Sequence, residues 1–321
     1  MARPKFPIDT KMLTKASQIF ENDFESDATI EVLVDASASS ELVAFCRKAL
    51  NVRSNDVELT VSRFDADMPA LNKETSFIIV IAGTSPYLRR MMEISLWSDM
   101  SSVYLSEDAA TLVSTVSQED ALDIAKTIIE VDVTQSQAVF EKQLAKWCVA
   151  HLPDLRLSLG SAFPFMRNAA ALDLTRQTSL ENAVVAAVFF LPGADLPVLT
   201  LNQCKLLYKI AVINKVPISR ERLVDAALVV GSAFGLRSLS RLAVRKLGPV
   251  GWLARAAIAF GSTMAMGHAA NELYRRGGGV MELVGDKLKS DAVSEGAASQ
   301  DDALHNHASQ GGSVPQNGSE Y

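Results

Sequence analysis

The amino-acid sequence predicts an α/β domain followed by an all-α domain. Strand-like runs alternate with helical patterns over residues 28–133, whereas only helical patterns occur over residues 134–285. Alternating strands and helices are typical of a small Rossmann-like domain, a parallel sheet with helices on both faces. We expect a short helix and a linker at residues 1–27, and a disordered tail at residues 286–321, which contain almost no apolar side chains.

Net charge divides the chain at nearly the same place. Residues 1–154 contain 14 Lys and Arg against 24 Asp and Glu, residues 155–285 contain 15 against 7, and residues 286–321 contain 2 against 6. A basic middle segment indicates an anionic partner, or equally an attraction between the basic and the acidic parts of the chain.

Strands of the α/β domain are predicted over residues 29–34, 57–61, 77–81 and 102–105. The third is a continuous β-branched run, as expected for a strand covered on both faces. Helices are predicted over residues 39–50 and 89–97, and a further one begins near Ser117-Gln118-Glu119-Asp120, a pattern typical of a capped helix start.

Helices of the second domain are predicted over residues 137–151, 180–191, 196–213, 219–246 and 250–274. The longest stretch without a charged residue, 256–271, has 16 residues, fewer than the about 20 that a membrane-spanning helix needs. We therefore favour buried helices of a compact bundle, with a helical pair inserted into a bilayer as the alternative.

Cysteine usage and the N-terminal residues bear on localisation. Cys46, Cys148 and Cys204 lie far apart, so neither a disulfide framework nor a metal site is expected, and no motif implies a cofactor. The first residues lack the apolar run of a secretory signal. We expect a cytoplasmic protein that is not secreted, with possible association with the inner membrane.

Several short motifs occur in order along the helical half and resemble a bacterial signature. They are Pro192-Gly193-Ala194-Asp195-Leu196-Pro197, Leu201-Asn202-Gln203, Gly248-Pro249-Val250-Gly251-Trp252 and Ala265-Met266-Gly267. Together they are similar to domain of unknown function 697, whose members include the YcjF-type proteins, and the resemblance covers about residues 140–276. It implies a link to GTPases, frequent assignment to the inner membrane, and no established catalytic activity.

The link to GTPases makes the phosphate-binding motifs worth testing in the α/β domain. After the first predicted strand the chain reads Asp35-Ala36-Ser37-Ala38-Ser39-Ser40-Glu41, without the glycines and the lysine that cradle phosphates in a P-loop. The other nucleotide-binding motifs of GTPases are also missing. The domain is therefore interpreted as a degenerate, GTPase-like module, with a generic Rossmann-like module as the alternative.

Two sets of residues are candidates for binding. Asp35, at the end of the first strand, and Gly83, Thr84 and Ser85, which follow the third, form a candidate ligand site because N–H groups at a helix start can hold an anion. Arg237, Arg241, Arg245, Lys246 and Arg255 form a candidate basic surface, suited to an anionic membrane or simply solvated. Nucleic acid is not favoured, because no aromatic residues interleave with these arginines.

Other polar residues of the helical half have structural explanations. Asp195 is expected to cap a helix, Gln203 to cross-link helices in the core, and His268 to lie buried on an apolar helix. No complete catalytic set is present. The sequence therefore favours a non-enzymatic interaction or regulatory protein that acts with a GTPase, at the cytoplasmic membrane surface, or both. A multi-pass inner-membrane protein and a nucleotide- or small-ligand-binding enzyme are the alternatives, and the oligomeric state is not indicated.

Overall fold

The computed structural model describes residues 28–52, 57–66, 72, 74–97, 100–188, 196–216 and 251–276. Several predictions lie outside these residues. They concern the segment 1–27, Pro192, Gly193 and Asp195, the helix 219–246 with Arg237, Arg241, Arg245 and Lys246, Gly248, and the tail 286–321.

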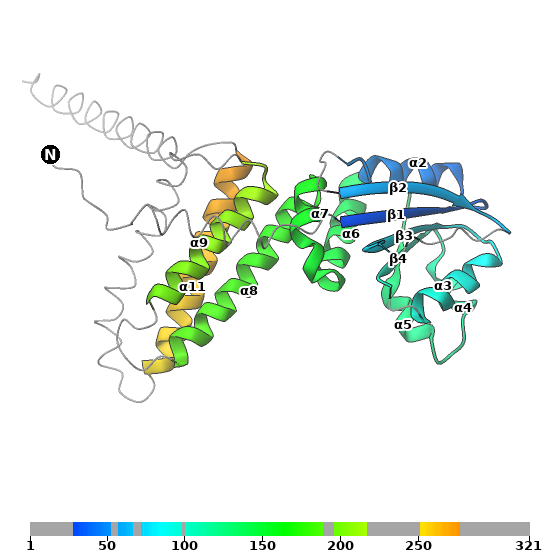
Figure 1. Cartoon of the computed structure of the whole chain (residues 1–321). Helices are drawn as coiled ribbons and strands as arrows, with labels where there is room; N and C mark the ends of the chain where they lie inside the picture. The colour runs from blue at the N-terminus through cyan, green and yellow to red at the C-terminus, as the bar shows by residue number, and fades with distance from the viewer. Residues whose placement is uncertain are drawn as a thin grey trace, which may run out of the picture.

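Five parallel strands form one sheet at one end of the molecule (Figure 1). They are β1 (Ala28–Asp35), β2 (Val57–Phe64), β3 (Phe77–Ala82), β4 (Ser102–Ser106) and β5 (Ile128–Glu130). The strand order is β2-β1-β3-β4-β5, one of the two common orders of doubly wound α/β sheets. The parallel sheet and its first four strands are confirmed. The fifth, only three residues long, is too short to show a pattern in the sequence.

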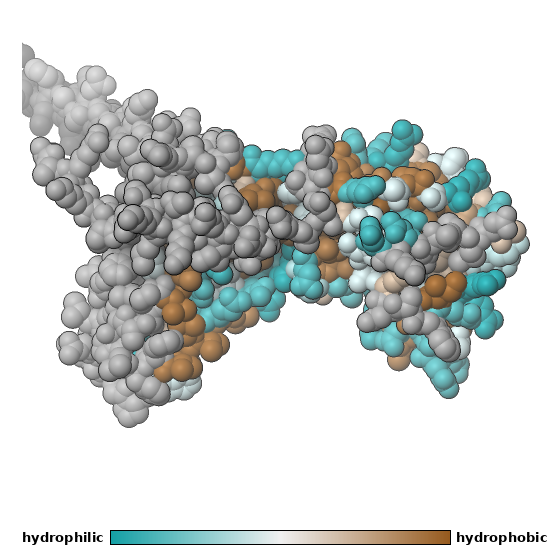
Figure 2. Space-filling view, viewed as in Figure 1, coloured by the Kyte–Doolittle hydropathy of each residue, from teal (hydrophilic) through white to brown (hydrophobic). Residues whose placement is uncertain are grey.

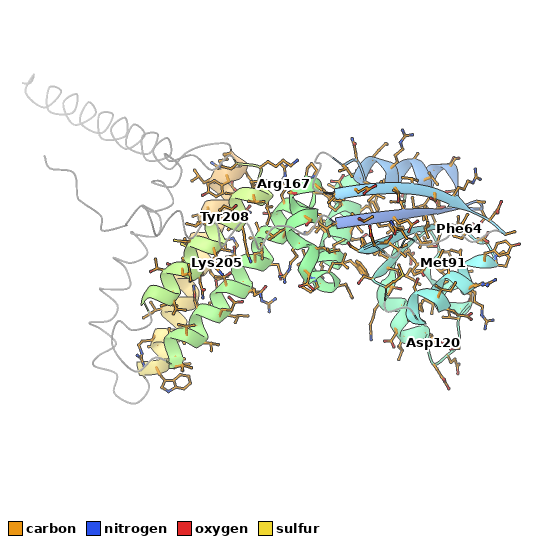
Figure 3. The ribbon with its side chains drawn as sticks, viewed as in Figure 1. Phe64, Met91, Asp120, Arg167, Lys205 and Tyr208 are labelled. Carbon is orange, nitrogen blue, oxygen red and sulfur yellow. The ribbon has the colours of Figure 1, made fainter. Side chains whose placement is uncertain are left out.

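Helices cover both faces of the sheet because successive side chains of a strand point to opposite sides. Ile30 and Ile79 face α2 (Ser40–Ala49) and α6 (Gln137–His151) in one core cluster. Leu33 and Val80 face the other side, where the packing helices are α3 (Tyr87–Trp97), α4 (Ala109–Ser114) and α5 (Ala121–Thr127). Phe64 and Met91 belong to this second cluster (Figure 3).

Two buried thiols lie in the first core cluster and make the fold sensitive to alkaline pH. Burial raises the pKa of Cys46 from 9.0 to about 12, with a smaller contribution from Glu107, and burial raises the pKa of Cys148 to about 12. The unfolded chain ionises these thiols near pH 9, whereas the folded chain does not. We therefore expect the free energy of unfolding to be intact below pH 9 and to fall above it, by about 1.4 kcal/mol per thiol for each pH unit.

Urea unfolding between about pH 8 and about pH 10 measures this loss. The Cys148→Ala variant should show a shallower decrease with pH, because one of the two thiols no longer titrates. An equal slope for the variant and the wild type would show that the buried thiols do not cause the loss.

A short helical segment connects the sheet to three long helices at the opposite end of the molecule (Figure 1). The connecting elements are α6, the 3-10 helix η1 (Pro153–Leu155) and α7 (Arg156–Ala162), and the long helices are α8 (Met166–Val188), α9 (Leu196–Ile213) and α11 (Gly251–Arg275). Arg156 pairs with Asp173, which ties α7 to α8. Arg167 lies at this junction (Figure 3).

The long helices differ from the sequence prediction in one respect. The helix predicted over residues 180–191 is the last part of α8, which begins at Met166. In the part of α8 that was not predicted, Thr175 and Ser179 are buried beside apolar residues, so this part lacks the apolar stripe that identifies an amphipathic helix in a sequence. The helix predicted over residues 196–213 is confirmed. Within the described residues, no helix is long and apolar enough to cross a membrane.

Candidate functional site

The carboxyl ends of β1 and β3 meet at the position where doubly wound sheets usually bind ligands. β1 leads into α2 on one face of the sheet, and β3 leads into α3 on the other. From this position the chain adds β2 on one side and β4 and β5 on the other, so the helices that follow β1 and β3 diverge to opposite faces. Ligands of such sheets bind in the crevice between the two diverging connections. Asp35 ends β1, and Gly83, Thr84 and Ser85 follow β3. The structure thus brings the four residues of the candidate ligand site together.

The side-chain carboxylate of Asp35 itself accepts the hydrogen bonds that the N–H groups at this position could give to a ligand. It is almost fully buried and accepts hydrogen bonds from the backbone N–H of Gly83 at 3.1 Å and of Ser85 at 3.3 Å. It also accepts from the backbone N–H of Ser37 at 3.1 Å and from the Ser37 hydroxyl at 2.9 Å. The Thr84 N–H donates to that same hydroxyl oxygen at 2.9 Å. The N–H groups expected to hold an external anion therefore all have acceptors inside the protein.

The loops that follow β1 and β3 pack closely together at Gly83. A Cβ atom added to Gly83 would lie 2.5 Å from the backbone nitrogen of Ala38 and 2.5 Å from the carbonyl carbon of Ser37. No real Cβ approaches backbone atoms so closely, so only glycine fits between the loops after β1 and β3. Glycine therefore serves here to bring two backbones together, with the carboxylate as their common acceptor.

Further acidic residues surround this edge of the sheet. The Ser39 hydroxyl donates to Glu107 at 2.7 Å, and Asp108 caps α4 by accepting from Thr111. Hydrogen bonds from the side chain and backbone of Thr111 lower the pKa of Asp108. Negative charge at this edge opposes the binding of a phosphate. In the described part of the chain, no three His, Cys, Asp or Glu side chains are placed to hold a metal ion.

Amide and hydroxyl side chains connect the three long helices in their interior. Asn182 of α8 donates to the hydroxyl of Thr263 in α11 at 3.0 Å, and Gln203 of α9 contacts the same hydroxyl at 3.5 Å. The prediction that Gln203 cross-links helices is therefore confirmed. A second set, nearer to the sheet, joins Asn271 of α11 to Asn168 at 2.9 Å and to Asn214 at 3.2 Å.

These contacts define the directions of the helices. Residue numbers decrease along α8 and increase along α11 between the two sets, so α8 and α11 run antiparallel. The same comparison shows that α9 and α11 run parallel. The last residue of α8 and the first residues of α9 and α11 therefore lie at one end, away from the sheet (Figure 1).

Other positions singled out in the sequence have separate places in the helices. Pro197 is in the first turn of α9, Gly251 begins α11, and Gly267 lies against Thr175 of α8. Arg255 is half-buried in the second turn of α11. The prediction of a buried His268 was wrong, because this residue is exposed on α11. An apolar helix in a three-helix arrangement still has one free face, and His268 lies on it.

A group of exposed apolar side chains lies where the three long helices end. Of the twelve large hydrophobic residues exposed in the described chain, seven belong to this group, which we call the distal apolar surface. Figure 2 shows apolar residues gathered over this end of the helices. Its members are Leu180, Val184 and Val188 of α8, Val198 and Leu201 of α9, and Trp252 and Leu253 of α11. The spacing of four between the α8 residues is visible in the sequence, but the helices of this half were predicted to be buried in a compact bundle.

Comparison with known proteins adds no relative to this description. No family model matches the chain, and no curated protein matches it. The resemblance to domain of unknown function 697 therefore stays a prediction, and the function has to be argued from the residues themselves.

Proposed function

We propose that this chain is a non-enzymatic interaction protein that binds its partner through the distal apolar surface. The single observation that carries this proposal is the concentration of seven exposed hydrophobic residues at one end of the long helices. Large apolar side chains gathered on a surface favour contact with a protein or a membrane. The partner is a GTPase, an anionic membrane surface, or both, in agreement with the resemblance of this region to a GTPase-associated family.

The α/β domain has a supporting role in this proposal. Its crevice at the β1–β3 boundary is filled by Asp35, and its loops lack the glycines and the lysine of a phosphate-binding loop. We infer a degenerate, GTPase-like or generic Rossmann-like module that keeps the architecture without the chemistry. A nucleotide-binding enzyme is the second candidate, and the position of Asp35 disfavours it.

A capture experiment with matched variants tests the proposal. The full-length protein serves as bait for cell extract and for membrane vesicles, beside a Val184→Asp, Leu253→Asp double variant and a Leu122→Asp control. Leu122 is 76% exposed on α5, far from the distal apolar surface, so its variant adds a charge without touching that surface. We expect capture of a GTPase or of vesicles by the wild type and by the control, and its loss in the double variant.

Two results would contradict the proposal. One is capture by the double variant at the level of the wild type. The other is a rise in melting temperature with GTP, ATP or NAD, because a ligand that binds the folded state stabilises it. That second result would favour the enzyme.

A further inference from the structure

We propose that the outer edge of β2 pairs with the same edge of a second copy of this chain, in an antiparallel arrangement centred on Thr60. β2 is the outermost strand of the sheet, and within the described chain β1 is its only neighbouring strand. The sheet and the distal apolar surface lie at opposite ends of the molecule (Figure 1). The inference is therefore independent of the proposed function, and the two can fail separately.

One backbone hydrogen bond determines which groups of β2 point outward. The N–H of Ala36 donates to the carbonyl oxygen of Phe64 at 2.9 Å, so the backbone groups of Phe64 point toward β1. Successive residues of a strand direct their N–H and C=O groups to alternate sides, and the register with β1 runs without interruption along β2. The backbone groups of Leu59 and Val61 therefore point away from the sheet, where no described residue forms a hydrogen bond with them.

The side chains in the middle of β2 are accessible on both faces of the strand. Val61 lies on the same face of the sheet as Val32 and is 64% exposed. Glu58 and Thr60, which point to the opposite face, are exposed as well. A strand edge that combines unpaired N–H and C=O groups with an exposed β-branched side chain is a template for pairing with another strand. A β-strand is therefore the kind of partner that this edge fits.

The side-chain pattern of β2 favours a second copy as that strand. An interface between two identical copies must be complementary to itself. Apolar Leu59 and Val61 flank Thr60, and polar Glu58 and Ser62 follow on either side. In an antiparallel pair centred on Thr60, Leu59 lies opposite the partner's Val61, and Glu58 lies opposite the partner's Ser62. The apolar side chains thus cover each other, and no two charged side chains of β2 lie directly opposite each other.

The outward direction of the backbone groups also determines the distance between the two copies. Leu59 and the partner's Val61 exchange backbone hydrogen bonds, so Thr60 and the partner's Thr60 form a non-hydrogen-bonded pair, with Cα atoms about 4.5 Å apart. Disulfides span Cα separations of about 4.4–6.8 Å. A cysteine in place of Thr60 therefore reaches its counterpart in the partner. A cysteine in place of Glu58 lies four residues, or roughly 13 Å, along the strand from its own counterpart.

Sedimentation equilibrium of the full-length protein at several concentrations tests the association. We expect a concentration-dependent dimer and a rise in its Kd of at least about tenfold in the Val61→Pro variant. Proline removes the outward N–H group of this residue and leaves the hydrogen bonds between β2 and β1 in place. The Val61→Thr variant keeps the N–H group and the branched shape, so it should dimerise nearly as the wild type does. Urea unfolding checks that each variant is folded. A monomer at every concentration, or equal Kd values for Val61→Pro and the wild type, would overturn the inference.

Disulfide cross-linking tests the register of the two strands. Cys46 and Cys148 are buried, and Cys204→Ala removes the more accessible native thiol. In that background, mild oxidation should join two copies of the Thr60→Cys variant, whereas the Glu58→Cys variant, exposed on the same face, should stay unlinked. Equal cross-linking of both variants, or cross-linking of Glu58→Cys alone, would overturn the proposed pairing. The Val184→Asp, Leu253→Asp double variant should dimerise like the wild type, because the distal apolar surface takes no part in this contact.

Discussion

The Asp35→Ala variant is expected to lose about 2–4 kcal/mol of unfolding free energy, because three partly buried N–H groups would lose their common acceptor, a buried carboxylate. These groups belong to Ser37, Gly83 and Ser85, on the loops that follow β1 and β3. A buried donor without a partner costs about 1–3 kcal/mol, and hydrogen bonds to a carboxylate are among the stronger ones.

Urea unfolding followed by circular dichroism measures this loss. The Asp123→Ala variant is a suitable control, since this carboxylate is 67% exposed on α5 and pairs with the equally exposed Lys126. It should differ from the wild type by less than about 1 kcal/mol. The Asp35→Asn variant keeps the size of the side chain and one acceptor oxygen, so we expect an intermediate loss. A fully stable Asp35→Ala variant would mean that the carboxylate does not hold the loops together.

The second large effect is expected from Gly267→Ala, at the contact between α11 and α8. An added Cβ would lie 2.3 Å from Cγ2 and 2.9 Å from Cβ of Thr175. Thr175 is fully buried, and its hydroxyl donates to the carbonyl oxygen of Ala171 at 2.7 Å, so it has little freedom to move. Overpacking of this kind costs about 1–3 kcal/mol, and it outweighs the gain in helix propensity.

Gly261→Ala on the same helix is the matched control. A Cβ at this position meets nothing within 4 Å. The substitution should therefore stabilise the protein by about 0.5–1 kcal/mol, the usual difference between glycine and alanine within a helix. The two identical substitutions, six residues apart, are thus expected to change stability in opposite directions. Equal melting temperatures for both variants would show that α8 and α11 do not pack at Gly267.

Segments that bury only apolar side chains were predicted from the sequence, whereas a segment that also buries polar side chains was missed. The continuous apolar run of β3 was identified because both faces of that strand are covered. The first half of α8 was missed, because it buries Thr175 and Ser179 together with alanines, and such a face has no apolar periodicity. Buried polar side chains are stabilised by hydrogen bonds to neighbouring helices. The sequence of one helix alone therefore does not show which of its polar residues are buried.

The candidate site shows the same limit. The residues Asp35, Gly83, Thr84 and Ser85 were identified from their positions after strands, and the structure places them together. The hydrogen bonds between Asp35 and the N–H groups after β3 could not be predicted. They depend on the adjacency of β1 and β3 in the sheet, and β2 separates these two strands in the chain. The distal apolar surface was missed for a related reason, since an apolar stripe in a sequence does not reveal whether another element covers it.

The polar contacts between α8 and α11 join segments that are far apart in the chain, so they can form only late in synthesis. Asn182 and Thr263 are 81 residues apart in the chain, and Asn168 and Asn271 are 103 apart. During synthesis α8 and α9 therefore emerge well before α11, and contacts of such long range form slowly. The inner face of α8 carries asparagine, threonine and serine, which water can solvate during that interval. We therefore expect these polar side chains to limit aggregation of the incomplete chain before α11 is made.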